Sequence, residues 1–274
     1  SFQIVERLKA DQGLTGELRE VPPEGSLLPE TYSVPRGSAR TAVIEMMQSA
    51  QKRVLDQLWA ERADGLPLKS PQEALVLASI VEKETGRNDE RERVAAVFVN
   101  RLRQNIRLQS DPTILYGLAQ GRVQWGKPIM RSEIQSQTAH NTYVIPGLPP
   151  TPICNPGRAS IEATLKPANT KELFFVADGK GGHIFAETLK DHNANVAKWR
   201  EVEKAIQQQR AQSQGAAPAL APTTTLNAGA QQGRSALGAP VAPAQKAPAQ
   251  QPAAAAPAKD AQPAAVPAKP AAKN

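Results

Sequence analysis

The sequence predicts an α+β fold in which a helical core carries a small β-hairpin and is followed by a disordered Ala/Pro-rich tail. Several segments of the first 210 residues repeat apolar residues every three or four positions, the period of amphipathic helices. Two short apolar segments flank the turn sequence DGKGG at 178–182, which is typical of a β-hairpin. Residues 211–274 hold ten of the 24 prolines and no aromatic residue, so they cannot bury enough apolar surface to offset chain entropy. The chain therefore divides into a folded domain at 1–210 and a disordered tail at 211–274.

The net charge of +7 gives little support for a nucleic-acid partner. The tail carries five Lys or Arg and one Asp, so +4 lies there and +3 remains for the folded domain. The tail cations are dilute and have no interleaved aromatic residues, which single-stranded nucleic acid binders use for stacking. We predict no nucleic-acid partner; a strong loss of binding with salt would contradict this.

Cysteine and histidine contents argue against a disulfide framework and against a metal centre. The one cysteine, Cys154, cannot form an intramolecular disulfide, and the three histidines lack the HxxxH-like spacing of zinc sites. The sequence therefore predicts no metal and no cofactor, and it leaves the redox compartment open.

The N-terminus gives no sign of a membrane anchor, but it begins abruptly. No run of 18 apolar residues is present, and no basic segment precedes an apolar one as in a signal peptide. The chain starts at Ser1, inside an apparent amphipathic helix marked by Phe2, Val5 and Leu8. We therefore expect a preceding segment to be missing from this sequence.

Periodicity and capping signals place the other elements. The expected helices lie at 38–62, 70–86, 88–103, 159–165 and 189–210, with the hairpin at 172–189. In the second of these helices, Ser70 and Glu73 form a capping box around Pro71, and Gly86 marks the end. In the third, Asn88 or Asp89 is the expected cap, with Val, Phe and Leu inward and Arg and Glu outward. Residues 105–158 look like long ordered loops, which are usually functional in a compact domain.

One carboxyl group of the 70–86 helix points in an unusual direction. At 100° per residue, Glu84 projects between Leu77 and Ile80 on the bulky apolar face, whereas Glu82 points to the opposite side. Desolvation on such a face disfavours the charged form, raises the pKa and suits a general acid. The alternative is that the projection errs or that Glu84 is paired with a buried Arg. Spacing alone does not decide between the two.

Several long motifs resemble the MltG (YceG-like) family of endolytic murein transglycosylases. They occur in family order over roughly residues 20–200: EGSLLPETY at 24–32, ASIVEKETG at 78–86, ERERVAAVFVNRLRQNIRLQSDPTILYG at 90–117, NTYVIPGLPPTPICNPG at 141–157 and LFFVADGKGGHIFAETLKDHN at 173–193. The resemblance does not reach the tail. It implies that residues 1–210 are a catalytic domain, and that the family's upstream membrane anchor and LysM-like segment are absent from this chain.

The resemblance also implies a reaction. Members of the family cleave the MurNAc-GlcNAc β-1,4 bond inside peptidoglycan strands without water and leave 1,6-anhydro-MurNAc ends. The essential glutamate is the second one of the EKE string, which is Glu84 here and is the residue that the helix projection selected. One glutamate then serves as acid and afterwards as base, whereas glycoside hydrolases normally need two carboxylates. The implied location is the inner membrane with the domain on the periplasmic side, near glycan strands and peptidoglycan synthases.

Polar residues of the predicted loops are candidates for contacts to the sugar. Gln109, Asp111, Asn141 and Tyr143 offer planar donors and acceptors and an aromatic face within family-matching motifs, while Tyr116 could equally pack. Asp111 is either a second carboxylate or a loop cap at SDPT, and Glu82 is expected on the surface. We expect the histidines at 183 and 192 to be structural and the hairpin glycines to serve turn geometry.

Two other functions remain open from the sequence. A non-catalytic glycan-binding or scaffold module would bind strands and release no anhydro ends. A muramidase would use water and leave reducing ends. The sequence distinguishes poorly between these products.

Overall fold

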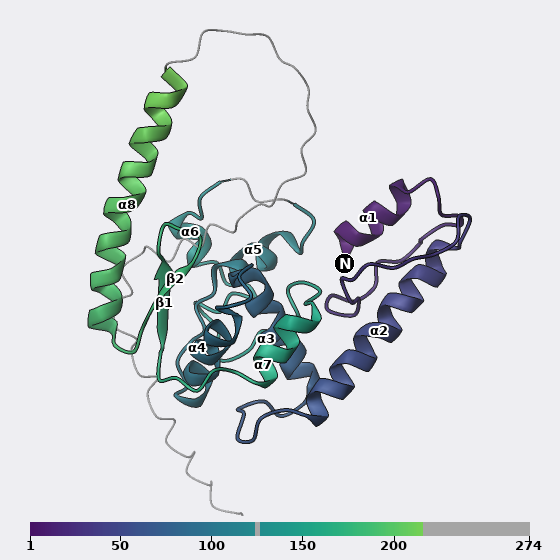
Figure 1. Cartoon of the computed structure of the whole chain (residues 1–274), viewed down its shortest axis with the longest axis horizontal. Helices are drawn as coiled ribbons and strands as arrows, with labels where there is room; N and C mark the ends of the chain where they lie inside the picture. The colour runs from purple at the N-terminus through teal and green to yellow at the C-terminus, as the bar shows by residue number, and fades with distance from the viewer. Residues whose placement is uncertain (124–126, 216–274) are drawn as a thin grey trace, which may run out of the picture. The chain divides into compact units, whose positions relative to one another are not determined.

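The computed structural model describes residues 1–123 and 127–215, and within them the fold is α+β as predicted (Figure 1). Eight helices and one two-stranded sheet lie in these ranges. In chain order the elements are α1 (Phe2–Ala10), α2 (Arg40–Ala60), α3 (Pro71–Glu84), α4 (Arg91–Arg103), α5 (Asp111–Ala119), α6 (Arg131–Ile134), α7 (Arg158–Leu165), β1 (Phe174–Ala177), β2 (His183–Ala186) and α8 (Leu189–Gly215). No helix among the described residues is long and apolar enough to span a membrane.

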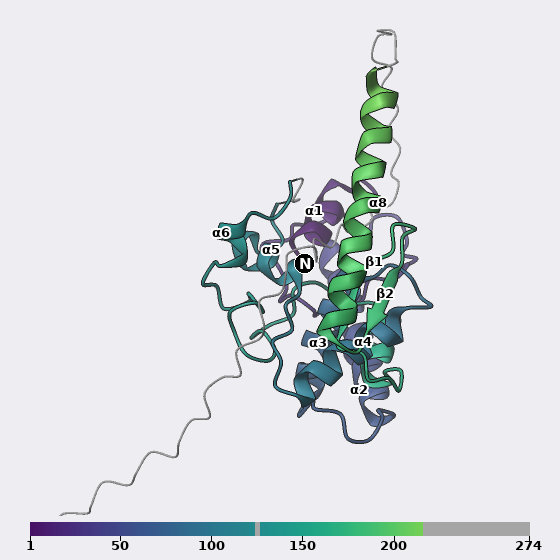
Figure 2. The ribbon, with the colours of Figure 1, turned by 90° about the vertical axis from the view of Figure 1, so that its left-hand side faces the viewer.

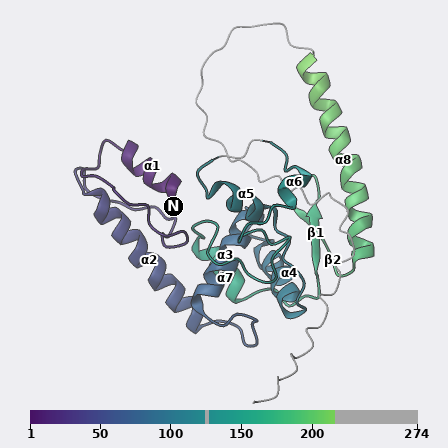
Figure 3. The ribbon, with the colours of Figure 1, turned by 180° about the vertical axis from the view of Figure 1, so that it is seen from behind.

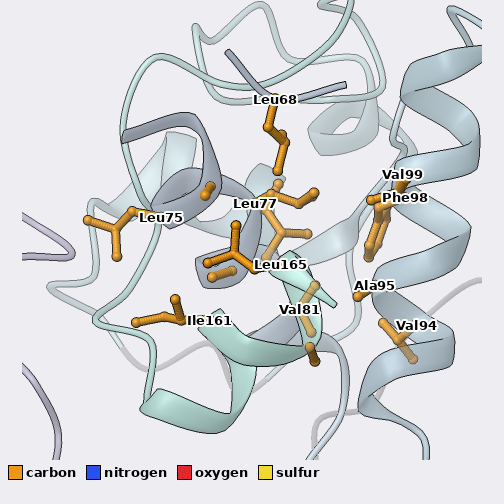
Figure 4. Close-up of a cluster of buried hydrophobic side chains, with 14 of the residues drawn as sticks. Leu68, Leu75, Leu77, Val81, Val94, Ala95, Phe98, Val99, Ile161 and Leu165 are labelled. Carbon is orange, nitrogen blue, oxygen red and sulfur yellow. The ribbon is translucent and has the colours of Figure 1, made fainter. Parts of the chain in front are cut away.

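Helix α3 is the centre of the core. Its residues 74–81 are all buried, so the helix is covered on every side, as expected for one that is apolar nearly all round. It packs against α4, α5 and α7. Leu77 and Val81 of α3 meet Leu165 of α7 and lie beside Phe98 of α4 (Figure 4). This packing fixes the direction of α3 and therefore of the residue at its C-terminal end.

The N-terminus of α3 follows half of the predicted capping box. The Ser70 hydroxyl accepts a hydrogen bond from the Glu73 N–H at 3.2 Å, and Pro71 begins the helix. The Glu73 carboxylate, however, accepts from the N–H of Lys69 at 2.6 Å, one residue before the expected position. At the other end, α3 stops at Glu84 because Thr85 is extended, so the expected end at Gly86 is two residues too late.

Helix α4 differs from the prediction at its start and on one face. It begins at Arg91, and neither Asn88 nor Asp89 caps it; the N-cap position is Glu90, whose side chain makes no cap bond. Val94 and Phe98 are buried as expected. Arg101 was expected to point outward, but only 6% of it is exposed. Periodicity shows which face of a helix carries a long cationic side chain, but it does not show that buried carbonyl groups accept hydrogen bonds from it.

The prediction of loops throughout 105–158 is wrong for α5 and α6, although much of the rest is loop. Helix α5 starts at Asp111 with Ser110 as N-cap and Pro112 in the first turn. These are ordinary helix-start signals, but Gly117 interrupts the helical pattern that follows them.

The predicted hairpin is confirmed. Strands β1 and β2 are antiparallel, with Phe174 opposite Ala186 and Ala177 opposite His183. The turn between them needs Gly179 and Gly181, whose φ angles of +81° and +90° are in the left-handed region. Helix α8 lies along this sheet, as Figure 1, Figure 2 and Figure 3 all show. It continues past residue 210 to Gly215; the remainder of the predicted tail lies outside the described residues.

A second cluster of apolar residues lies between α1, the segment that follows it and α2. Its buried members are Val5, Leu14, Leu27, Val43, Ile44 and Met47. The Arg40 guanidinium donates to the carbonyl oxygens of Leu8 and Asp11 at 2.6 and 2.7 Å, which joins the end of α1 to the start of α2.

Candidate active site

Glu84 is a buried acid at the last position of α3. Only 6% of the residue is exposed, in agreement with the helix projection. Its Oε1 accepts a hydrogen bond from the Ser110 hydroxyl at 2.6 Å. Its Oε2 is also buried and has no hydrogen-bond partner in the structure. A buried carboxyl oxygen without a partner is costly when charged, so this site favours the protonated acid.

The electrostatic surroundings of Glu84 raise its pKa to about 8, mainly because burial removes the charged form from water. The Ser110 hydrogen bond acts in the opposite direction, the nearby Asp111 charge raises the pKa further, and Arg101 lowers it. Among the described residues, the sequence-based alternative of a direct pair with a buried Arg does not occur, and Arg101 acts on Glu84 only through space. Glu84 is therefore mostly protonated at neutral pH.

Ser110 is held by two buried threonines. Its N–H donates to the Thr142 hydroxyl at 2.9 Å, and its carbonyl oxygen accepts from the Thr113 hydroxyl at 2.6 Å. The two threonine hydroxyl oxygens are themselves 2.9 Å apart. All three residues are at most 1% exposed. These hydrogen bonds join the start of α5 to the loop after α6, and they set the position of the Ser110 hydroxyl that contacts Glu84.

Arg101 ties the same loop to the hairpin. Its Nε donates to the Leu173 carbonyl at 2.6 Å, while Nη1 donates to the Leu108 carbonyl at 2.9 Å and to the Gln109 side-chain oxygen at 3.2 Å. Burial lowers the pKa of Arg101 to about 10, so it stays cationic at neutral pH. The guanidinium therefore serves as a fixed cation beneath the loop that carries Ser110.

The predicted residues Gln109, Asp111 and Tyr143 lie around Ser110. Gln109 is half-buried, has a left-handed φ of +52°, and donates its N–H to the Thr142 carbonyl at 3.2 Å. Asp111 is the first residue of α5, 4% exposed, and accepts a hydrogen bond from the Tyr143 hydroxyl at 2.6 Å. Burial and the Asp111 carboxylate together raise the pKa of Tyr143. Asp111 is thus a bonded carboxylate at the start of α5.

Asn141 holds its own loop together. It is fully buried, its amide donates to the carbonyls of Ile134 and Ser136 at 2.9 and 2.8 Å, and its oxygen accepts from the Tyr143 N–H at 3.0 Å. The structure therefore gives Asn141 a supporting position behind Thr142 and Tyr143, and its predicted contact with substrate stays a prediction.

Glu82, expected on the surface, is partly exposed and also serves as a cap. Its Oε2 accepts from the Gly157 N–H at 3.1 Å and from the Ser160 hydroxyl at 2.6 Å, so it caps the N-terminus of α7 from a neighbouring helix. A projection of one helix cannot show a second helix end packed against its polar side. By contrast, His183 bonds Glu90 at 2.8 Å and His192 stacks on Phe174, which are the structural positions expected for both.

Sequence reasoning missed Ser110, Thr113, Thr142 and Arg101. All four lie in the strings that carried the family resemblance, but hydroxyl groups give no periodic signal, and only the tertiary structure brings residue 142 next to 110 and 113.

Two surface hollows, of about 160 and 200 Å³, share Glu24 as a lining residue. The first is also lined by Tyr116 and Gln120, and the second by Lys83 and Asn155. Tyr116 lines a hollow and packs against the core, as one of its two alternatives expected; its contact with the sugar stays a prediction. Glu84 is not one of the described residues that line these two hollows.

Comparison with known proteins gives a consistent result. The model of the YceG-like family matches residues 1–198. An endolytic murein transglycosylase of Bacillus subtilis (strain 168) is 32% identical over 179 residues, covering 65% of this chain and 48% of the relative. An endolytic murein transglycosylase of Streptococcus pneumoniae serotype 2 (strain D39) is 33% identical over 181 residues, covering 64% of this chain and 32% of the relative.

A solved structure is also similar. A YceG-like protein from Listeria monocytogenes is 34% identical with a TM-score of 0.53, covering 62% of this chain and 54% of that one. The matches thus span about half the length of the Bacillus relative and about a third of the pneumococcal one. The extent of the family match over the folded domain shows that the chain belongs to the YceG-like family.

Proposed function

We propose that this domain is an endolytic lytic transglycosylase that cleaves the MurNAc-GlcNAc β-1,4 bond of peptidoglycan and leaves 1,6-anhydro-MurNAc ends. The observation that carries the proposal is Glu84, a buried acid with one unpartnered oxygen and a pKa raised to about 8. Such a group holds a proton at neutral pH and can deliver it to a leaving oxygen. The names of the Bacillus and pneumococcal relatives support the same substrate class.

The reaction needs one carboxyl group in two successive roles. In the first step protonated Glu84 donates its proton to the glycosidic oxygen, while the MurNAc N-acetyl group assists at C1 as the C1–O bond breaks. In the second step the C6 hydroxyl attacks C1, and anionic Glu84 removes the hydroxyl proton. Glu84 ends protonated, as it began, and no water is consumed.

The neighbouring carboxylate is poorly suited to act as a nucleophile or as a base for water. Asp111 accepts a hydrogen bond from Tyr143 and is 4% exposed. A hydrolase of the usual kind needs a second carboxylate placed at the sugar, with room for water in the inverting case. This arrangement favours the transglycosylase over the muramidase. Gln109 and Tyr143, which lie beside Ser110, are the predicted contacts to the sugar.

We further propose that the domain works on the periplasmic side of the inner membrane, held there by an anchor upstream of this sequence. Nascent glycan strands would be its substrate and peptidoglycan synthases its neighbours. These statements rest on the family resemblance.

The test is mass spectrometry of products from purified glycan strands treated with wild type, Glu84→Gln and the matched control Glu82→Gln. We expect anhydro ends from the wild type and from Glu82→Gln, and none from folded Glu84→Gln. Reducing ends would support a muramidase. Strand binding without cleavage by a folded wild type would support a binding module.

A further inference from the structure

Ser110 occupies an N-cap position without capping its helix. A serine at this position normally accepts a hydrogen bond from an N–H of the first turn, as Ser70 does at the start of α3. Ser110 makes no such side-chain bond to α5; its hydroxyl is directed at Glu84 instead, at 2.6 Å. Helix α5 therefore lacks the stabilisation of a side-chain cap, and the hydroxyl contacts the acid instead.

The direction of this hydrogen bond decides where the acidic proton lies. A serine hydroxyl has one proton to donate, and Glu84 Oε1 is the acceptor that the structure places within reach of it. Oε1 is then an acceptor, so the proton of the neutral carboxyl belongs on Oε2. Oε2 is the buried oxygen that has no hydrogen-bond partner in the structure, so a proton on it is not already donated to another group.

The hydroxyl is also held firmly. The Ser110 N–H and carbonyl oxygen are both bonded to threonine hydroxyls, at 2.9 Å to Thr142 and 2.6 Å to Thr113. These two hydrogen bonds fix the Ser110 backbone. The hydroxyl therefore keeps its position even if the Glu84 carboxyl group rotates.

On this geometry, and resting on the proposed function, we propose that Ser110 is a positioning residue that assigns the acidic proton to Glu84 Oε2. In the second step the same hydroxyl stabilises the Glu84 anion while it waits for the C6 hydroxyl proton. Ser110 acts through Glu84 and does not itself contact the reacting atoms.

Three other groups act on Glu84 and must stay constant in the test. They are Arg101 from α4, Asp111 from α5 and Tyr143 from the loop after α6. Arg101 and the Ser110 hydrogen bond lower the pKa of Glu84, whereas Asp111 raises it. Removing only the Ser110 hydroxyl therefore raises the pKa of Glu84.

The experiment titrates the Glu84 carboxyl carbon by NMR in the full chain labelled with ¹³C-glutamate, with the signal assigned by its absence in Glu84→Gln. We expect Ser110→Ala to move the midpoint upward by about 0.5 to 1 pH unit, since a hydrogen bond to an anion is lost. The release of anhydro ends at pH 7 should fall about tenfold, because the anion of the second step loses its partner.

Ser110→Thr, which keeps a hydroxyl, should restore the wild-type midpoint and rate. Ser110→Cys fills the site with a weak donor and should behave like Ser110→Ala, which guards against a cavity effect. Ser79→Ala is the matched control. The Ser79 hydroxyl is also buried on α3 and bonds the Ile153 N–H at 2.9 Å, so its loss costs stability without touching Glu84.

An unchanged midpoint in folded Ser110→Ala, or an equal shift in Ser79→Ala, would overturn the role of Ser110. A wild type that releases no anhydro ends would instead overturn the proposed function, because the titration does not depend on activity.

Discussion

Two glutamates of α3, two positions apart, have opposite environments. Glu82 is partly exposed, and its Oε2 accepts from the Gly157 N–H and the Ser160 hydroxyl at the start of α7. Glu84 has one bonded oxygen and one buried oxygen without a partner. The comparison teaches that burial separates two glutamates of one helix. A carboxylate that reaches solvent and caps a neighbouring helix contributes to the structure, whereas a buried carboxyl group with one unpartnered oxygen favours its proton.

The strongest way to break this comparison is to neutralise each glutamate in turn. Glu84→Gln removes the proton donor, and general acid–base catalysis contributes about 10²- to 10⁴-fold, so we expect the release of anhydro ends to fall by that factor. Glu82→Gln should stay within about threefold of wild type. A similar loss in both variants, measured as initial rates on defined strands, would show that the two positions do not differ in function.

The pH dependence of stability sharpens the contrast. The pKa of Glu84 is raised from 4.5 to about 8 in the folded state, so the folded protein binds this proton more tightly than the unfolded chain. Its stabilising effect is complete below pH 4.5 and is lost as the pH rises through about 8.

Glu84→Gln cannot ionise, so its unfolding free energy relative to wild type should increase by on the order of 3 kcal/mol between pH 4.5 and pH 7. Urea unfolding across this pH range measures the difference. A difference between the two proteins that stays flat with pH would show that Glu84 has an ordinary pKa.

The activity of the wild type should report the same group. Catalysis requires protonated Glu84, so kcat/KM should decline above a pH of about 8, by about tenfold per unit. Initial rates from pH 5 to pH 10 on a single substrate give the profile. A decline near pH 5 instead would place the essential carboxyl among ordinary, exposed acids.

Removing the cap contributed by Glu82 should affect stability rather than chemistry. Glu82→Ala leaves the Gly157 N–H and the buried Ser160 hydroxyl without their acceptor, which should lower the unfolding free energy by about 2 kcal/mol. The pH at which activity declines should not move. Chemical denaturation together with the pH–rate profile tests both parts, and a shifted profile would contradict the assignment.

The smallest expected effect concerns the two serines at helix starts. Ser70→Ala removes a true cap of α3 and should lower the unfolding free energy by about 1 kcal/mol without changing the titration of Glu84. Comparison with Ser110→Ala then separates a capping serine from one that serves the acid. Identical effects of the two substitutions on stability and titration would remove that distinction.

Much of the fold could be read from the sequence. Helical periodicity located α2, α3, α4 and the start of α8, and the DGKGG turn located the hairpin. These features depend on local contacts, so a window of a few turns contains the information. Helix α5 escaped because Pro112 and Gly117 lie within it, whereas α7, which is not longer, contains neither Pro nor Gly.

The sequence by itself determined that Glu84 faces the apolar side of its helix, since 100° per residue follows from helix geometry alone. Only the tertiary structure decided what Glu84 meets there. Thr142, which is distant in the sequence, accepts from the Ser110 N–H and so places the Ser110 hydroxyl against Oε1. Tyr143, equally distant, donates to Asp111. Hydrogen bonds between distant segments depend on how the helices pack, and packing is a property of the whole core that no single segment contains.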